Sequence, residues 1–178
     1  MFTIEPIQAR HEAAFLDATR RSARLHRPWI SPPRTVAGFR QHLRRYEAVN
    51  QASYVAVAND RSLIGCVHLN EIVHGALESA YLAYFAFEPH QGRGLMSKVL
   101  AGVVDLAFTR HGLHRVEANV QPSNQASKAL VERLGFRLEG FSPRYLKIDG
   151  HWRDHERYAL TVEEWAGPGR SAGLSSSA

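Results

Sequence analysis

The sequence has little of what secreted and membrane proteins contain. Its 178 residues include one cysteine, Cys66, which excludes an intrachain disulfide framework and a multi-cysteine zinc site and favours a reducing compartment. No apolar run approaches the ~18 residues that cross a bilayer. The start, Met1–Pro6, lacks the basic and apolar segments of a secretory signal. We therefore expect a cytoplasmic protein with no membrane contact.

Several sequence motifs of common enzyme classes are also missing. The glycines match neither the Rossmann spacing G-x-G-x-x-G nor the Walker spacing G-x-x-x-x-G-K-[ST]. The G-x-S-x-G elbow of a serine hydrolase is absent. Histidines such as His151 and His155 share a strand face but have no carboxylate and third ligand at a metal-binding spacing. We predict that they are structural and that the protein binds no metal.

The chain is long enough for one hydrophobic core. Of its residues, 44% are hydrophobic, so residues 1–166 are predicted to form a single domain. Residues 167–178 are rich in Gly, Ser and Ala and are expected to form a disordered tail.

Hydrophobic periodicity predicts alternating strands and helices. A proline-rich loop, Arg27–Pro33, follows a helix predicted over His11–Arg24, and Thr35 caps the next helix. Asp149-Gly150 indicates a tight turn between the last two strands. The other predicted strands are Phe2–Ile7, Ser53–Ala58, Leu63–Leu69, Tyr81–Phe87 and Leu113–Val120.

The most informative segment is Gln91-Gly92-Arg93-Gly94-Leu95-Met96. It lies between the aromatic strand Tyr81–Phe87 and a helix in which apolar residues recur at i, i+3 and i+4 from Met96 to Phe108. Two glycines, a basic residue and no carboxylate leave backbone N–H groups free at a helix N-terminus. This arrangement favours binding of phosphate or pyrophosphate.

A second motif follows the predicted strand Leu113–Val120. Ser123 or Asn124 can cap a short helix, and Gly135 suits its C-terminal end before Phe136 begins another strand. The residues read N-x-x-S-x-x-L…LGF, with Ser127 one helical turn inside the helix.

The two motifs together resemble those of the GNAT superfamily of N-acetyltransferases. The Gln-x-x-Gly-x-Met loop is similar to the acyl-CoA pyrophosphate loop of that superfamily, although Met96 replaces its usual last residue. With Leu113–Val116 and Tyr145–His155, the chain resembles ribosomal-protein-alanine N-acetyltransferases of the RimJ type from about Leu63 to Trp165.

This resemblance implies an α+β (α/β/α) fold with a mixed, mostly antiparallel sheet flanked by helices. The strand ending at Phe87 is expected to splay from the one beginning near His114, which admits the pantetheine arm of acetyl-CoA. The resemblance implies that the backbone of Phe85, Ala86 and Phe87 pairs with pantetheine, and that Asn124 contacts it. The pyrophosphate is expected on Gln91, Gly92, Arg93, Gly94, Leu95 and Met96.

The expected chemistry needs a neutral amine, a polarised thioester carbonyl and a proton for the departing thiolate. A strand N–H at Phe87 or its neighbour is predicted to polarise the carbonyl. Ser127 matches the family's proposed proton donor, with a helix-surface hydroxyl as the alternative. Candidate bases are Glu71, Glu78 and Tyr81. The alternative for each glutamate is an ordinary surface residue, and the alternative for Tyr81 is a residue of the apolar core.

The acceptor implied by the family is the α-amino group of a ribosomal protein, with alanine first. Alternatives are a small amine, a polyamine or an antibiotic, or a non-catalytic ribosome-assembly role, because the N-terminal third matches weakly. The net charge of +5 includes arginine clusters that either form solvated helix faces or contact ribosomal particles. Monomer and homodimer both remain open. The clustered residues are Arg20, Arg21, Arg24, Arg27, Arg40, Arg44 and Arg45.

Overall fold

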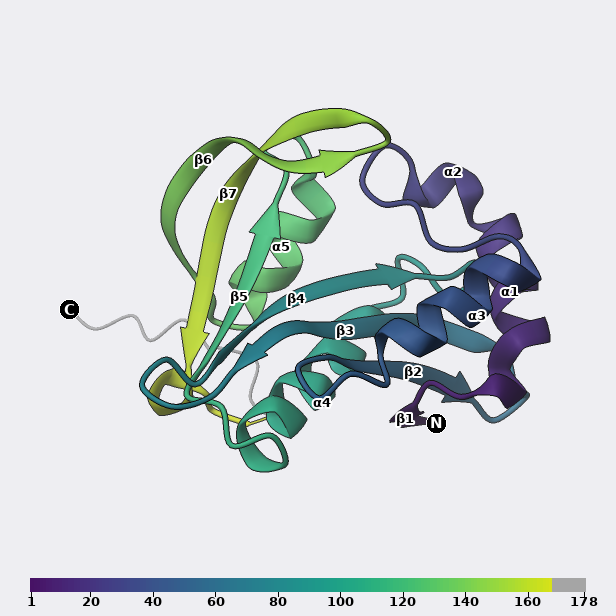
Figure 1. Ribbon diagram of the computed structural model, residues 1–178, viewed down its shortest axis with the longest axis horizontal. Coiled ribbons are helices and arrows are strands. Elements are labelled where there is room, and N and C mark those ends of the chain that lie inside the picture. Colours follow the sequence, from purple (N-terminus) through teal and green to yellow (C-terminus); the bar gives the residue numbers. More distant parts are fainter. Residues whose placement is uncertain (168–178) are drawn as a thin grey trace.

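One seven-stranded sheet organises the protein, for which a computed structural model describes residues 1–167 (Figure 1). The predicted Gly/Ser/Ala tail, apart from Gly167, lies outside the described residues. The strand order is β1-β2-β3-β4-β5-β7-β6, and every neighbouring pair is antiparallel except β4 and β5. The strands are β1 (Phe2–Pro6), β2 (Ala52–Ala58), β3 (Leu63–Val73), β4 (Ser79–Ala86), β5 (Arg115–Val120), β6 (Arg137–Ile148) and β7 (His151–Thr161).

Helices cover both faces of this sheet and enclose two hydrophobic cores. Side chains alternate between faces along β4, so Leu82 packs in the core with α4, whereas Phe85 packs in the core with α1 and α3. The predicted mixed, mostly antiparallel sheet flanked by helices is confirmed. The helices are α1 (Glu12–Arg21), α2 (Ala23–His26), α3 (Val36–Arg45), α4 (Leu95–Thr109) and α5 (Gln125–Arg133).

The helix predicted over His11–Arg24 is divided in two. The Ser22 hydroxyl donates to Ala18 O at 2.7 Å and accepts from the Glu88 N–H at 2.9 Å. A serine hydroxyl that competes for backbone groups disfavours a continuous helix. The interruption therefore ties the end of α1 to the segment that follows β4.

The two parallel strands β4 and β5 separate along their length. They pair only where Ser79–Leu82 meets Arg115–Ala118. Beyond Leu82, β4 continues to Ala86 paired with β3 alone, and β5 continues to Val120 paired with β7 alone. The predicted splay is thus confirmed, and it leaves one backbone edge of β4 without a strand partner.

The β6–β7 hairpin reaches over this opening towards the loop after α2 (Figure 1). Its turn is Asp149-Gly150, as predicted, with φ values of 48° and 82°. The Asp149 carboxylate accepts a hydrogen bond from the Ser31 hydroxyl, which joins the hairpin tip to that loop. Within residues 1–167 no helix is both long and apolar enough to cross a membrane.

Candidate active site

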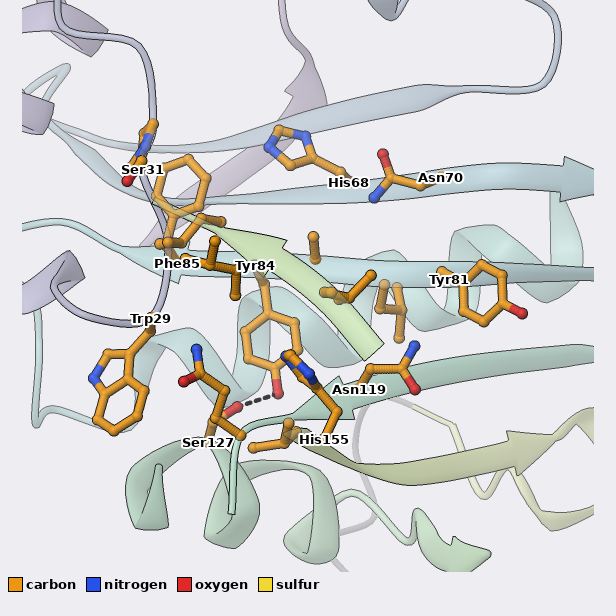
Figure 2. A pocket seen from close by; sticks show the side chains of 18 of the residues that line it. Trp29, Ser31, His68, Asn70, Tyr81, Tyr84, Phe85, Asn119, Ser127 and His155 are labelled. Atoms are coloured by element: carbon orange, nitrogen blue, oxygen red, sulfur yellow. Dashed lines mark hydrogen bonds between the residues drawn. The ribbon is translucent and has the colours of Figure 1, made fainter. Parts of the chain in front are cut away.

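A cleft of about 710 Å³ runs through the gap between β4 and β5 (Figure 2). Its walls come from β3, β4, β5, α3, α5, the β6–β7 hairpin and the loop after α2. Tyr46 and His68 line it on the α1/α3 face of the sheet, and Ser127 lines it from α5 on the other face. Two reactants could therefore approach each other from opposite faces of the sheet.

Beyond the end of β4, the N-terminus of α4 has the geometry of an anion site. Gly92 and Gly94 have φ values of 71° and 70°, a left-handed conformation that favours glycine. No side chain caps α4, its first turn contains no acidic residue, and a Cβ added at either glycine would meet no atom within 4 Å. Free N–H groups, open space and the helix dipole together fit a pyrophosphate.

The free edge of β4 presents different backbone groups from those predicted. The Phe87 N–H donates to Ile64 O at 2.8 Å, and Phe85 lies opposite Cys66 in the same antiparallel ladder. Because alternate residues of a strand direct their amides to opposite edges, the Tyr84 and Ala86 groups face the opening. The expectation that Phe85 and Phe87 offer free backbone groups is therefore wrong, since β3 already uses them.

Only part of the Ala86 peptide group is available at this edge. His26, from α2, is buried, and its Nε2 donates to Ala86 O at 2.8 Å. The carbonyl can only accept, so the hydrogen bond fixes the proton on Nε2. The Ala86 N–H and the Tyr84 groups remain for a ligand that pairs with β4.

Asn124 and Ser127 lie at the start of α5, as expected. The Asn124 side chain caps the helix by accepting from the Ser127 N–H at 3.1 Å, which confirms its predicted capping role. The Ser127 hydroxyl shares a hydrogen bond of 2.6 Å with the hydroxyl of Tyr84 (Figure 2). Burial raises the pKa of Tyr84 to about 12, so the pair holds both hydroxyl protons at neutral pH.

In the sequence, Tyr84 is not distinguishable from the other aromatic residues of a buried strand, so it was not among the predicted site residues. Tyr84 and Ser127 are 43 residues apart, and only the packing of α5 beside β4 brings the two hydroxyls together. No local pattern in the chain signals that contact.

The predicted bases have different positions. Glu71 lines the cleft at a bulge of β3, where its carboxylate accepts from the Asn50 and Gln51 side chains at 3.4 and 3.1 Å. Tyr81 also lines the cleft but lies well away from the Tyr84–Ser127 pair (Figure 2). Glu78 directly precedes the end of β4 that pairs with β5, and it is not among the residues that line the cleft.

An aromatic wall of His42, Tyr46 and His68 forms part of the cleft on the α3 face. The Tyr46 and His68 rings stack with centroids 4.6 Å apart, and His42 lies 4.8 Å from Tyr46. Burial lowers the pKa of His42 to about 4 and holds the pKa of His68 well below its usual range. This wall is therefore uncharged at neutral pH, and its residues come together only through the fold.

The charged side chains of the cleft balance one another. Arg45 and Lys147 are cationic, and Glu71 and Asp149 are anionic. Within residues 1–167 no cluster of three or more histidine, cysteine or acidic residues could hold a metal ion.

Comparison with known families identifies the chemistry. Residues 2–137 match the acetyltransferase (GNAT) domain family. The chain belongs to this GNAT family. It is an acyltransferase, and the acetyl-transfer activity expected from its motifs is confirmed.

Some relatives of this GNAT enzyme have an acceptor in their name and others do not. The probable N-acetyltransferase YjcK of Bacillus subtilis is 38% identical over 131 residues, 71% of this chain and 72% of that protein. The [ribosomal protein uS5]-alanine N-acetyltransferase of Escherichia coli is 38% identical over 112 residues, 63% of this chain and 57% of that protein.

Solved GNAT structures share the architecture. RimJ of Mycobacterium smegmatis, solved in complex with CoA-disulfide, has a TM-score of 0.82 and 31% identity, covering 92% of this chain and 83% of that one. Spermidine N-acetyltransferase of Vibrio cholerae, solved with CoA and spermine, has a TM-score of 0.78 at 20% identity, covering 92% and 96%. At that identity the second likeness concerns the fold alone.

Proposed function

We propose that this GNAT enzyme transfers the acetyl group of acetyl-CoA to the N-terminal α-amino group of a ribosomal protein, with alanine as the first residue. The supporting observation is the uncharged acceptor side of the cleft, where His42, Tyr46 and His68 form an aromatic wall and the charges balance. The 38% identity to a protein named for uS5-alanine acetylation agrees with this acceptor.

The acid–base properties of the acceptor explain why a neutral wall suffices. An α-amine has a pKa of ~7.7–8.0 and a lysine side chain ~10.4, so at pH 7 roughly a tenth of α-amines is neutral but under a thousandth of lysines. A site with uncharged walls does not assist deprotonation of the amine, so it favours an acceptor that is already neutral in solution. An N-terminal amine is that acceptor.

The co-substrate is proposed to run along the free edge of β4. The N–H groups from Gly92 to Met96 bind its pyrophosphate, and the backbone edge at Tyr84 and Ala86 pairs with its pantetheine arm. Asn124, which lines the same cleft, contacts that arm. The likeness to the RimJ structure that holds CoA-disulfide supports this placement.

The Tyr84–Ser127 hydroxyl pair is proposed to protonate the leaving thiolate. A thiolate of ordinary pKa, ~8.5 for cysteine, gains a proton at little cost from a positioned donor. Ser127 then draws a proton from Tyr84 across their 2.6 Å hydrogen bond. Glu71 and Tyr81 stay candidate proton acceptors because both line the cleft.

Polyamine acetylation is the other activity that the fold allows. Spermidine carries several positive charges and needs several unpaired carboxylates, because each buried ammonium requires a partner. The two lining carboxylates, Glu71 and Asp149, are offset by Arg45 and Lys147. The charge balance of the cleft therefore favours the N-terminal acceptor.

Contact with ribosomal particles and a cytoplasmic location form part of the proposal. Of the seven clustered arginines, Arg21 and Arg40 pair with acidic side chains and Arg20 bonds a backbone carbonyl. Arg45 lines the cleft, and the others, Arg24, Arg27 and Arg44, form no ion pair with any described residue, which suits an anionic partner.

The test is a comparison of acceptors under identical conditions. An Ala-starting peptide, the same peptide blocked at its N-terminus but carrying lysine, and spermidine are each incubated with acetyl-CoA and followed by mass spectrometry. Acetylation of the free peptide alone, with kcat/KM rising with the apparent pKa of the free amine, ~7.7–8.0, supports the proposal. Equal labelling of the blocked peptide, or faster labelling of spermidine, refutes it.

A further inference from the structure

His155 of β7 is a buried residue that also lines the cleft. Its side chain is 2% exposed and lines the cleft, with its ring 6.0 Å from that of Tyr145. Nδ1 lies 3.0 Å from Arg153 O. A carbonyl oxygen only accepts hydrogen bonds, so Nδ1 carries the proton, and in the neutral ring Nε2 carries a lone pair.

The Nε2 atom of this ring is unpaired within residues 1–167. It has no hydrogen-bond partner among the described residues, and it is not one of the unpaired polar atoms that the protein shields fully from solvent. His155 lines the same cleft as Asn119 and the hydrogen-bonded pair Tyr84–Ser127, and Figure 2 labels all four residues. The ring is therefore held by Nδ1, and its unpaired Nε2 belongs to a residue that lines the same cleft as the Tyr84–Ser127 pair.

We propose that His155 is the general base of the reaction and takes the proton from the attacking amine through Nε2. This inference rests on the proposed function, because it places the thioester beside Tyr84 and Ser127. It differs from the sequence prediction, in which His155 is structural and Glu71 or Tyr81 is the base.

The proton and bond changes balance with these groups. The amine nitrogen forms a bond to the thioester carbonyl carbon, and the nitrogen becomes positively charged. His155 Nε2 accepts one proton from that nitrogen as the carbon–sulfur bond breaks. The electron pair leaves on sulfur, which takes a proton from the Ser127–Tyr84 pair. The imidazolium of His155 then returns its proton to solvent, and the hydroxyl pair recovers one.

The surroundings keep His155 ready to accept a proton. Burial lowers its pKa, while the hydrogen bond to Arg153 O and the Asp154 carboxylate oppose that shift. Tyr145 of β6 and Tyr84 of β4 face the cleft as uncharged phenols, because burial raises the pKa of each to about 12. From α5, Lys128 is paired with Glu156 at 2.9 Å. The lowered pKa favours the neutral ring, in which Nε2 can accept a proton.

The decisive experiment compares His155→Asn with a matched control, His151→Asn. His151 lies on the same strand, and its Nδ1 contacts Asp149 O at 2.9 Å, but it is exposed and outside the cleft lining. An asparagine can keep the donor to the backbone carbonyl in both variants and removes the imidazole lone pair. Both variants are first checked for folding by circular dichroism and for binding of CoA.

The expected result is a kcat about 10²–10⁴-fold lower in His155→Asn, the range of general base catalysis, with unchanged KM for acetyl-CoA. The parent kcat should rise with an apparent pKa below 6.5, and this dependence should vanish in the variant. Free imidazole should restore part of the activity of His155→Ala. His151→Asn should behave like the parent.

Two outcomes overturn the assignment. If His155→Asn turns over within threefold of the parent, or if it loses activity only through weaker binding of acetyl-CoA, His155 is not the base. If His155→Asn does not fold, the assignment is tested by the kcat of His155→Gln and by whether free imidazole restores activity to His155→Ala. Ratios are measured on whichever acceptor the parent acetylates fastest, so failure of the N-terminal acceptor is seen separately in the parent.

Discussion

Replacing Gly94 with valine tests the pyrophosphate site most directly. Gly94 has a φ of 70°, and the space where its Cβ would lie contains no atom within 4 Å. A valine side chain there fills the space that the pyrophosphate is proposed to occupy. It therefore prevents the backbone N–H groups from approaching the pyrophosphate. The left-handed conformation also costs about 1–2 kcal/mol of stability for a residue with a Cβ.

Gly75→Val is the matched control because it imposes the same backbone cost elsewhere. Gly75 lies in the loop between β3 and β4, with a φ of 81° and again no atom within 4 Å of an added Cβ. Both variants should therefore lose a similar free energy of unfolding. Only the Gly94 variant should lose affinity for CoA.

The expected loss follows from the hydrogen bonds that the valine prevents. Each bond to a charged group contributes about 1.5–3 kcal/mol, so losing two weakens binding by about 10²–10⁴-fold. At CoA concentrations of about 100 times Kd, the parent gains about 2.7 kcal/mol. For a domain of this size that raises Tm by about 5–11 °C.

Thermal denaturation with and without CoA measures this effect. The parent and Gly75→Val should show the full Tm increase, and Gly94→Val should show almost none. Isothermal titration calorimetry then gives the change in Kd. If CoA stabilises Gly94→Val as much as Gly75→Val, the pyrophosphate does not bind at the N-terminus of α4 and the placement of acetyl-CoA must be abandoned.

Three other predictions follow from the site and the core. Ser127→Ala should lower kcat by about 10²-fold with acetyl-CoA affinity retained, and adding Tyr84→Phe should cost little more if the hydroxyls act as a unit; normal turnover would leave the pair without a role. Asn124→Ala should lose about 1 kcal/mol in urea unfolding, and no loss would contradict the cap. Because the pKa of His42 is lowered to about 4 in the folded protein, its contribution to stability is present above pH 6.5 and is lost as pH falls towards 4; His42→Leu should flatten that decline in unfolding free energy.

The family and the left-handed backbone at Gly92 and Gly94 could be predicted from local signals. Gly92 and Gly94 stand where a strand pattern meets a helix pattern, and backbone conformation at glycines is decided mainly by adjacent residues. The Asn124 cap acts across three residues, and the Asp149-Gly150 turn within two. Each of these features depends on neighbours in the chain and can therefore be inferred without knowledge of the fold.

The partners within the cleft depended on tertiary structure. The register of β4 against β3 decides which backbone groups face the opening: those of Tyr84 and Ala86, not that of Phe87. A shift of one residue would exchange the residues that face the two edges of β4. The sequence predicts a structural role for His155, because nothing nearby in the chain shows that it lines the same cleft as Tyr84 and Ser127. Such contacts join residues far apart in sequence, and only the packing of complete strands and helices determines which side chains meet.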